Sequence, residues 1–560
     1  MTSSANYWDR KRLSRRRFIG GSGVALAGGA AILAGCGDDG EAKPSATASA
    51  SAAAATTAGT TAAMPKKGGT IRWGIESDIA TMDPVWTTAT PTHHMAHNLY
   101  EPLFAYDANV KPQPMLVKDY TASPDKLTYT FNLRPDATFE GGRALTSADV
   151  IVSIQRWAKR VPAGVVLARS LNSLQAKGDN AFVLETKTPF GPLIDVLATG
   201  GGGGSGPYIM TKEAAATPAD QKVDEVIASG PFRLAEWSKG TRIVLKPRAD
   251  YVSGSGTPSN IAGKRTVYVD AVEIPILADD NGRISGLQAG TLDIVTQPSN
   301  DYYDQFKKDS QYETQQRFPG YAVVLLNNSK PPFSNVLARQ ALQAAIDVEK
   351  TLTAGFGDQF VVCPTIFLCG SANESKASID QYNQKDLTKA KRLFQQLVDS
   401  GGYDGRPVTY LSNTTLSFIF NASQVVRQTL ESIGFKVDFK APDFATATTL
   451  RASKENWDLF HTGGVHGAGQ NDPLRPLTLN PAGPGWYDSK EMQALQGEYV
   501  AAVTPEQQKA VLDKVQALWY KDVPHILIGQ GKVFDVYRKY VKGFSDYPVW
   551  GSFFNVWLDK

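Results

Sequence analysis

The chain has 560 residues, of which 42% are hydrophobic and 10% aromatic, so it can bury one or more large cores. This composition excludes a small disulfide scaffold and a disordered tail protein. The net charge is only +3, and the first 35 residues hold six basic residues and one acidic residue. The rest of the chain is therefore slightly acidic, which argues against nucleic acid as a partner.

Segment 1–35 predicts an export signal. A twin-arginine pattern, Ser14-Arg15-Arg16-Arg17-Phe18-Ile19, precedes a weakly apolar stretch that is too short and too mild for a stable membrane span. The stretch ends at Leu33-Ala34-Gly35-Cys36, which resembles the lipobox of bacterial lipoproteins. We therefore expect export by the twin-arginine route and attachment of lipid to Cys36. The alternative is a plain cleaved signal that is followed by a chance cysteine.

Segment 36–67 is expected to carry the lipidated cysteine and a flexible linker. Residues 45–63 are exclusively Ala, Ser, Thr and Gly, which have no large side chains to bury. No later stretch of about 18 apolar residues predicts a membrane-spanning helix. The sequence thus indicates a folded body held outside the cytoplasm, on the cell membrane, by a lipid.

The two remaining cysteines, Cys363 and Cys369, lie in a Pro-containing loop. Export places them in an oxidising compartment, so we expect a local disulfide rather than two free thiols. A zinc site would need further ligands, and none is adjacent in the sequence.

Beyond the linker, the hydrophobic pattern predicts strands and helices that alternate without an internal repeat. Strands are expected at 67–75, 127–133, 229–237, 241–246, 269–277, 292–295, 525–528, 533–537 and 553–558. Helices are expected at 91–100, 146–157, 281–289, 335–352, 387–398, 418–433 and 505–520. Thr146-Ser-Ala-Asp149 forms a capping-box pattern, and Ser334 is the expected cap of the helix at 335–352. The pattern is that of a mixed α/β fold.

Several motifs occur in the order found in one known family. They include Gly68-Gly-Thr-Ile-Arg-Trp-Gly74, Leu127-Thr-Tyr-Thr-Phe-Asn-Leu-Arg134, Ser229-Gly-Pro-Phe-Arg-Leu234, Gly286-Leu-Gln-Ala-Gly-Thr-Leu-Asp-Ile294 and Asp522-Val-Pro-His-Ile526. In these the chain resembles the peptide/nickel class of ABC-importer solute-binding proteins, from about Gly68 to its C-terminus. The resemblance implies a two-lobed, periplasmic-binding-protein-like α/β fold with a hinge and an extra sub-domain inserted in lobe one.

By the same analogy, the parts of the folded body can be assigned to residue ranges. Lobe one is expected at 68–103, 228–318 and 523–560, the inserted sub-domain at 104–227 and lobe two at 319–522. The resemblance further implies a monomer that encloses an oligopeptide or peptide-like solute between its lobes. Because the solute contacts both lobes only when they close, it favours the closed state, which ABC permease subunits in the membrane can recognise.

Peptide-specific members of this class carry an Ala-Asp-Tyr triplet in lobe two, whose carboxylate pairs with the ligand's α-ammonium. Gly469 stands at the aligned position here, so recognition of a peptide N-terminus in the usual way is in doubt. Asp472 is a candidate replacement, although Asp followed by Pro473 is also an ordinary helix cap.

Four aromatic residues near predicted loops are candidate walls of the ligand site, with core packing as the alternative for each. They are Trp86, Tyr321, Trp486 and Tyr487.

Five of the six histidines fall in two places. His93, His94 and His97 lie on a predicted helix, and His461 and His466 border the lobe-two segment that contains Gly469. We take His461 and His466 as candidate ligand-binding residues. Because the family includes nickel importers, a chelated metal is an alternative solute, as is a small glycoside or opine-like solute. No resident metal or cofactor is predicted, and the simpler alternative is that these are surface or helix-end histidines.

An enzyme is not expected. The chain has no G-x-S-x-G, H-E-x-x-H or G-x-x-x-x-G-K-[ST] motif. Gly201 to Gly206 formally matches G-x-G-x-x-G, but no helix start follows it, so it is interpreted as a flexible loop. A secreted hydrolase is the alternative from another class.

Overall fold

The computed structural model describes residues 64–87, 89–200, 206–317, 321–367, 369–370, 373–464, 474, 476–544 and 551–560. These residues belong to one compact unit, Met64–Lys560. The predicted signal, Cys36 and the low-complexity linker at 45–63 lie outside the described residues. No helix within the described ranges is long and apolar enough to cross a membrane.

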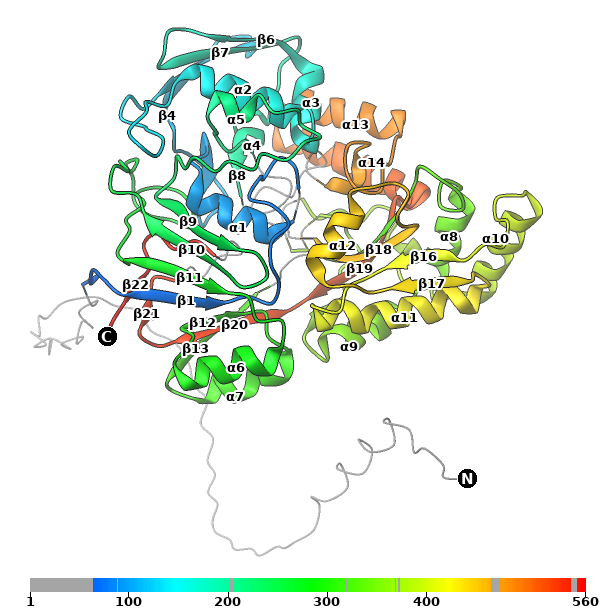
Figure 1. Ribbon diagram of the computed structural model, residues 1–560. Helices are drawn as coiled ribbons and strands as arrows, with labels where there is room; N and C mark the ends of the chain where they lie inside the picture. Colours follow the sequence, from blue (N-terminus) through cyan, green and yellow to red (C-terminus); the bar gives the residue numbers. More distant parts are fainter. Residues whose placement is uncertain are drawn as a thin grey trace, which may run out of the picture. The chain divides into compact units, whose positions relative to one another are not determined.

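Lobe one is built on a seven-stranded sheet in the order β13-β20-β12-β1-β11-β10-β9 (Figure 1). Its strands are β1 (Thr70–Gly74), β9 (Phe232–Ser238), β10 (Arg242–Pro247), β11 (Ala271–Pro275), β12 (Ile294–Thr296), β13 (Tyr312–Arg317) and β20 (Val533–Arg538). The central strand β1 runs parallel to both β11 and β12. Its side chains alternate: Ile71 and Trp73 are buried in the core, while Arg72 between them is half-exposed.

Three helices accompany this sheet: α1 (Thr90–Leu99), α6 (Asp280–Ala289) and α7 (Tyr303–Lys308). Figure 1 shows α6 and α7 packed beside β12, β13 and β20, and their apolar residues share a buried cluster with β13 and β20. Helix α1 begins next to Pro91, a residue whose fixed φ suits the first turn, and nearly all of its side chains are buried.

The segment between α1 and β9 forms a sub-domain with two small sheets. The four-stranded sheet has the order β4-β5-β7-β6, from β4 (Val117–Ala122), β5 (Thr128–Leu133), β7 (Ala181–Thr186) and β6 (Leu171–Ala176). The three-stranded sheet contains β3 (Pro112–Pro114), β2 (Phe104–Tyr106) and β8 (Ala198–Thr199). The helices are α2 (Ser147–Ala158), α3 (Pro162–Ser170), α4 (Leu193–Leu197) and α5 (Lys212–Ala215). The predicted capping box at Thr146 and Asp149 is confirmed at the start of α2.

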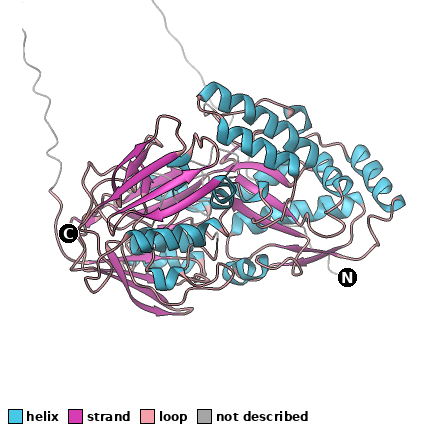
Figure 2. Cartoon of the chain, turned by 90° about the horizontal axis from the view of Figure 1, so that it is seen from above, coloured by secondary structure: helices cyan, strands magenta, loops and turns pink. Residues whose placement is uncertain are grey.

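Lobe two is built on a six-stranded sheet in the order β15-β19-β14-β18-β16-β17. Its strands are β14 (Tyr321–Leu326), β15 (Phe360–Val361), β16 (Val408–Leu411), β17 (Val437–Lys440), β18 (Leu459–Gly464) and β19 (His525–Gly531). Its helices are α8 (Val336–Ala345), α9 (Val348–Phe356), α10 (Leu387–Asp399), α11 (Ser417–Ile433), α12 (Phe444–Arg451), α13 (Lys490–Ala501) and α14 (Pro505–Asp522). Strand β14 is buried along its whole length, as expected of a central strand covered on both faces. In Figure 2 helices of this lobe gather at the end of the molecule opposite the strands of lobe one.

Two pairs of antiparallel strands connect the sheets. In lobe one β13 pairs with β20, ending with Arg317 opposite Val533, and in lobe two β14 pairs with β19, starting with Tyr321 opposite Gln530. Each connection is only a few residues long. The two lobes are therefore tied together by a pair of neighbouring chain segments, which is the arrangement of a hinge.

This connection corrects the predicted boundary at 523. The whole of 523–560 was assigned to lobe one, but β19 hydrogen-bonds to β14 in the sheet of lobe two. The chain returns to lobe one only after Gly531. The lobe to which a strand belongs depends on its hydrogen-bonding partner, and that partner lies about 200 residues away in the sequence.

The predicted helix at 335–352 is two helices. Ile346 has an extended conformation that ends α8, and the Asp347 side chain accepts a hydrogen bond from the Lys350 amide at 3.0 Å, which caps α9. The N-cap of α8 is Asn335 rather than the expected Ser334. A second internal cap thus interrupts an apolar periodicity that would suit one long helix. The expected strand at 553–558 is also shorter, with β22 confined to Trp557–Leu558.

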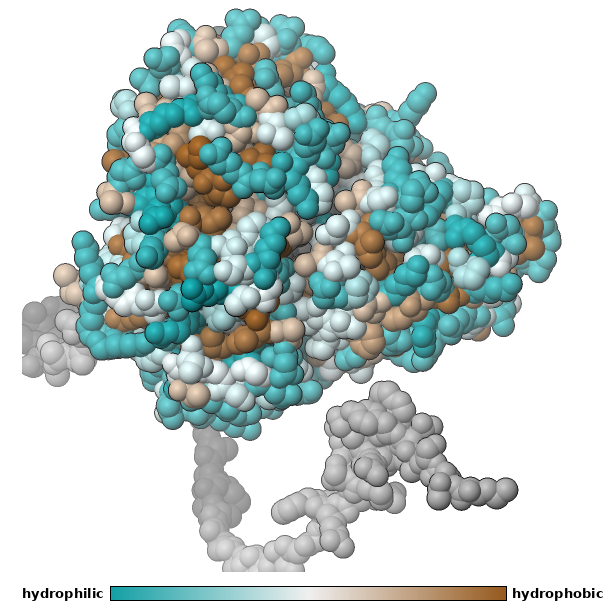
Figure 3. Space-filling model, viewed as in Figure 1, coloured by the Kyte–Doolittle hydropathy of each residue, from teal (hydrophilic) through white to brown (hydrophobic). Residues whose placement is uncertain are grey.

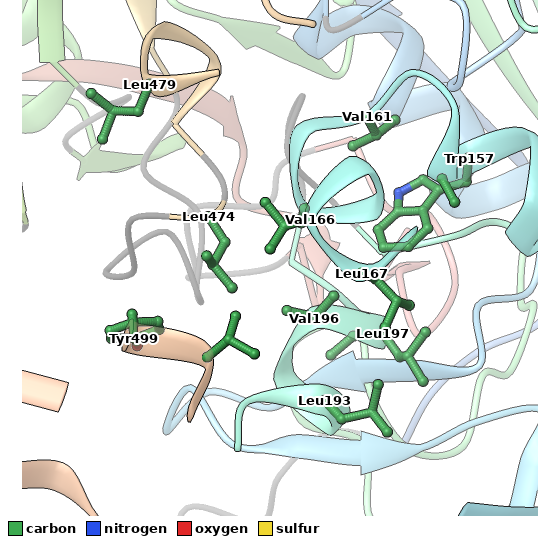
Figure 4. Packing of buried hydrophobic residues seen from close by; sticks show 14 of the residues in the cluster. Trp157, Val161, Val166, Leu167, Leu193, Val196, Leu197, Leu474, Leu479 and Tyr499 are labelled. Carbon is green, nitrogen blue, oxygen red and sulfur yellow. The ribbon is translucent and has the colours of Figure 1, made fainter. Parts of the chain in front are cut away.

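Figure 4 shows how one apolar cluster joins the inserted sub-domain to lobe two. Side chains of α2, α3 and α4, among them Trp157, Val166 and Val196, lie toward Leu474 and Tyr499. On the face shown in Figure 3, by contrast, apolar patches are small and separated by polar side chains. The apolar residues are thus collected mainly in the interior clusters.

A buried ion pair fixes the loop after β1 to the inserted sub-domain. Both oxygens of Asp83 accept hydrogen bonds from the Arg156 guanidinium, at 2.9 and 2.7 Å, and both side chains are almost completely buried. Asp83 also accepts from the backbone amides of Val85, Trp86 and Val223. The Asp83 carboxylate therefore connects three chain segments: the loop after β1, helix α2 and the segment at Val223.

Asp83→Asn is expected to lower the free energy of unfolding by about 3 kcal/mol or more, because breaking a buried ion pair leaves Arg156 buried without its counter-charge. Urea unfolding followed by tryptophan fluorescence measures this loss. The matched control is Glu498→Gln, which removes a pair with Lys514 whose side chains are 49% and 59% exposed. The control is expected to cost less than about 1 kcal/mol. Equal unfolding midpoints for the two variants would contradict the assigned role of Asp83.

Candidate functional site

A cavity with about 770 Å³ of empty space, part of it open to solvent, lies between the lobes. Lobe one contributes Trp73, Ile75, Glu76, Ser77, Ile79, Thr90, Pro91, His94, Met95, Thr296 and Gln297. Lobe two contributes Leu416, Phe418, Phe444, Thr462 and Gly463.

The position of the cavity follows from the topology of the sheets. In lobe one, the lining segments lie at the carboxyl ends of the neighbouring parallel strands β1 and β12. In lobe two, the residues of β18 that line the cavity lie near the carboxyl end of that strand. The N-terminal ends of α1, α11 and α12 supply most of the remaining residues. Open α/β sheets commonly bind ligands beyond the carboxyl ends of their strands, so this is the candidate binding site.

The walls of the cavity are largely apolar and aromatic. The Trp73 indole is held in place by a hydrogen bond of 3.1 Å from its Nε1 to Thr296 Oγ1, and it lies against Phe553 with ring centroids 5.3 Å apart. Phe418 and Phe444 face the cavity from lobe two. Rigid aromatic side chains offer a large contact area at low entropic cost, which suits the enclosure of an organic solute.

Glu76 is the single charged side chain among the described residues that line this cavity. It follows β1 directly, and its Oε2 accepts a hydrogen bond from Arg283 Nη1 of α6 at 3.3 Å. Burial raises the pKa of Glu76, while the positive charge of Arg283 opposes that rise. Arg283 also pairs with Asp280, so it is shared between two carboxylates.

Gln297 links the cavity to the hinge. Its backbone has a positive φ of 50°, and its amide donates to Phe534 O at 3.0 Å and to Asp535 Oδ1 at 3.2 Å. Asp535 in turn forms a buried ion pair with Arg317, the last residue of β13. A cavity-lining residue is thus bonded directly to one of the connecting strands.

Two of the predicted aromatic residues, Trp86 and Trp486, meet in a second cavity with about 640 Å³ of empty space. This cavity also spans the lobes, because Arg160 and Arg451 line it from opposite sides. The Lys222 ammonium lies 4.3 Å from the centre of the Trp86 ring, and the Trp486 ring lies 5.3 Å from that of Trp457. Neither tryptophan lines the first cavity.

The other two predicted aromatic residues do not line the first cavity. Tyr321 is buried, and its hydroxyl contacts Cys363 Sγ at 3.0 Å. Tyr487 donates a hydrogen bond of 2.5 Å to Asp522 Oδ2 and lines a separate cavity within lobe two. For Tyr321 the observed burial fits the alternative of core packing.

Cys363 and Cys369 are joined by a disulfide, with their Cα atoms 6.1 Å apart. Cys363 is buried in the cluster that contains Tyr321. The pair closes the loop that the sequence analysis singled out.

Of the candidates in the segment 461–473, only His461 belongs to the described residues. Its side chain is buried, and its Nδ1 shares a hydrogen bond of 2.7 Å with Tyr410 Oη. Burial lowers the pKa of His461 to about 3, so the ring is neutral at physiological pH. Its neighbours Thr462 and Gly463 line the cavity. Gly469, His466 and Asp472 lie outside the described residues.

The helix histidines are buried, which corrects the interpretation of them as surface or helix-end residues. His93 Nε2 contacts Thr87 O at 3.2 Å, and His97 Nδ1 contacts Tyr208 Oη at 2.7 Å. Burial lowers the pKa of His93 to about 4 and lowers the pKa of His94 and His97 as well. Of the three, only His94 lines the cavity. No group of three His, Cys, Asp or Glu residues that could hold a metal occurs in the described part of the chain.

The sequence analysis missed Trp73, Glu76, Phe418 and Phe444. Trp73 lies in the predicted strand at 67–75 and Glu76 directly after it, while Phe418 and Phe444 lie at helix starts. A search for side chains at the carboxyl ends of parallel strands would have found Glu76.

Four of the buried histidines, His93, His94, His97 and His461, have a lowered pKa, which predicts that stability falls as the pH is lowered. Each has a folded pKa below the unfolded value of about 6.5, so the unfolded chain binds protons that the folded chain does not. The free energy of unfolding is therefore expected to decrease below about pH 6.5, by at most about 1.4 kcal/mol per pH unit for each histidine.

Melting temperatures measured from about pH 7 to about pH 5 test this expectation. His461→Gln removes one titrating group while retaining an amide that can bond to Tyr410, so its melting temperature should fall less over the same range. An identical pH dependence for this variant and the unchanged protein would show that His461 does not contribute.

Two α/β lobes that are joined by paired strands and together line a cavity define the class of two-lobed solute-binding proteins. Residues 111–486 match the model of the bacterial extracellular solute-binding proteins, family 5. A probable peptide ABC transporter periplasmic-binding protein of Sinorhizobium fredii is 30% identical over 495 residues, which cover 85% of this chain and 91% of that protein. The chain belongs to this family, which confirms the resemblance in the sequence motifs.

Solved structures confirm the two-lobed α/β fold. AgaA of A. tumefaciens R10, in complex with agropinic acid, matches with a TM-score of 0.74 and 22% identity, covering 88% of this chain and 99% of that one. The periplasmic binding protein DppA of Helicobacter pylori, in complex with the peptide STSA, matches with a TM-score of 0.73 and 21% identity over the same shares.

Proposed function

We propose that this protein captures an oligopeptide or peptide-like solute outside the cytoplasm and delivers it to an ABC importer. The observation that carries the proposal is the cavity lined by both lobes, beside the strands that connect them. The names of the relatives support it, since the Sinorhizobium protein is described as a probable peptide binder and the Helicobacter protein was solved with a peptide. Membership of a solute-binding family favours binding and release of an unchanged solute over a secreted hydrolase.

The mechanism follows from the contribution of both lobes to the lining of the cavity. A solute that contacts Trp73 on lobe one and Phe418 on lobe two gains its full contact energy only when both walls are near it. It therefore shifts the equilibrium toward the closed arrangement, and the shift is limited by its difference in affinity for the two states. Trp86 and Trp486, which line the second cavity between the lobes, are proposed as additional contacts for a long solute.

Gly463 allows a direct test of the cavity. A Cβ atom built there meets only Ile419 Cδ1, at 4.0 Å, so Gly463→Leu places a side chain at the cavity wall without a backbone clash. We expect this variant to fold normally and to lose binding of a pool of di- to pentapeptides in thermal-shift measurements. In the unchanged protein, a ligand at about a hundredfold excess over Kd stabilises by about 2.7 kcal/mol.

The matched control is Gly497→Leu on the exposed face of α13, where a Cβ atom also meets nothing within 4 Å. It should bind as the unchanged protein does. Equal binding by the Gly463 and Gly497 variants would contradict the placement of the solute in this cavity.

We further propose that the protein is exported by the twin-arginine route and anchored to the cell membrane through lipid on Cys36. The supporting observation is the order of motifs in the sequence, in which the arginine pattern, the apolar stretch and the Leu33-Ala34-Gly35-Cys36 site follow one another.

Cys36→Ser is expected to move the protein from the membrane fraction to the soluble fraction, because the serine cannot take the lipid. Fractionation of cells followed by immunoblotting measures this shift. Lys67→Ser, a change outside the proposed lipid site, should leave the protein on the membrane. Retention of the Cys36 variant on the membrane would overturn the anchor.

A further inference from the structure

The charged side chains around the cavity carry more negative than positive charge, and we place the unbalanced negative charge at Glu76. Glu76 and Asp280 share the single guanidinium of Arg283. The nearby Arg317 is engaged by Asp535 in a buried ion pair. Together, these five side chains carry one uncompensated negative charge when all are ionised.

Nothing else on the described lining compensates this charge. His94 is buried, with its pKa lowered by burial, and the other described lining residues are apolar or neutral. The Glu76 side chain is only 16% exposed, so water screens it poorly. A partly buried, unbalanced carboxylate is costly, and a cation brought beside it would remove that cost.

We infer that Glu76 is the anchor for an ammonium group of the solute, held on lobe one and surrounded by aromatic walls. This inference rests on the proposed function and adds a substrate class to it: solutes with a primary ammonium attached to an apolar group. The aromatic rings of Trp73, Phe418 and Phe444 suit both the apolar group and the ammonium of such a solute, because aromatic rings pack against apolar groups and attract cations.

The geometry favours an ammonium over a metal ion. Glu76 is the one carboxylate on the described lining, and the described residues hold no metal-binding group of three ligands. A divalent cation takes several hard or nitrogen ligands, whereas an ammonium needs few acceptors and tolerates apolar neighbours. Arg283 holds Oε2 of Glu76 and so orients the carboxylate at the end of β1.

Matched peptide pools test the inference on the full-length protein by isothermal titration calorimetry. The first pool contains tripeptides of Ala, Leu and Phe with free N-termini, the second contains the same peptides N-acetylated, and the third contains N-acetylated tripeptides with one Lys. We expect the first pool to bind about 10- to 100-fold more tightly than the second, as for the loss of one charge-assisted hydrogen bond. Binding of the third pool would show that a side-chain ammonium can occupy the site beside Glu76. Failure of the third pool to bind would show that the site takes the ammonium of the peptide N-terminus.

Glu76→Gln should abolish the difference between the first and second pools while leaving the melting temperature of the unliganded protein nearly unchanged. The control is Glu273→Gln on the neighbouring strand β11, a half-exposed carboxylate outside the cavity lining, which should keep the difference. Equal affinities of the acetylated and free pools for the unchanged protein, or an undiminished difference in Glu76→Gln, would overturn the inference and leave the proposed function standing. Failure of all three pools to bind would contradict the proposed peptide-type solute, and the inference with it.

A pH series gives an independent readout. The groups near Glu76 are Arg283 and Asp280 of α6, Arg317 of β13, Asp535 of β20 and His94 of α1. Because burial raises the pKa of Glu76 above its usual value, affinity for the free-amine pool should fall as the pH is lowered toward about 5. This loss should be absent in Glu76→Gln, and its persistence there would assign the pH dependence to another group.

Discussion

The pairing of β13 with β20 and of β14 with β19 is the constraint on which the rest of the molecule depends. These strands hold the two lobes side by side while leaving only short connections between them. The buried ion pair of Arg317 and Asp535 fixes the lobe-one end of this connection. Because Gln297 bonds to Asp535 and also lines the cavity, a solute that changes the cavity can act directly on the connecting strands.

The chemistry of the cavity is that of a selective but adaptable enclosure. Aromatic side chains from both lobes provide contact area, and His94 and His461 remain neutral because burial lowers their pKa. One carboxylate, Glu76, lies among these walls, and we propose that it binds a charged group of the solute. On the proposed function, non-directional packing would accept varied apolar groups, while the directional charge contact would orient one polar end of the solute.

Local features were predicted well where the physical cause is local. The capping box of α2 and the neighbouring strands β9 and β10 follow from residues a few positions apart, and the capping box and both strands were expected. The helix at 335–352 was predicted as one because its apolar periodicity continues past Asp347, whose capping bond interrupts it. The burial of Tyr321 and of the helix histidines could not be predicted for a different reason: burial depends on which distant segments cover a side chain.

The sequence by itself determined the family, the α/β class, the capping box of α2 and the expectation of a local disulfide, because these depend on short motifs and on the spacing of neighbouring residues. Only the tertiary structure decided that β19 belongs to lobe two, that Trp86 and Trp486 share a second cavity, and that Glu76 is the charged residue of the first. The physical reason is that a cavity is lined by segments hundreds of residues apart. Neither their meeting nor the balance of charge among Glu76, Arg283 and Asp280 has a signature in any one stretch of the chain.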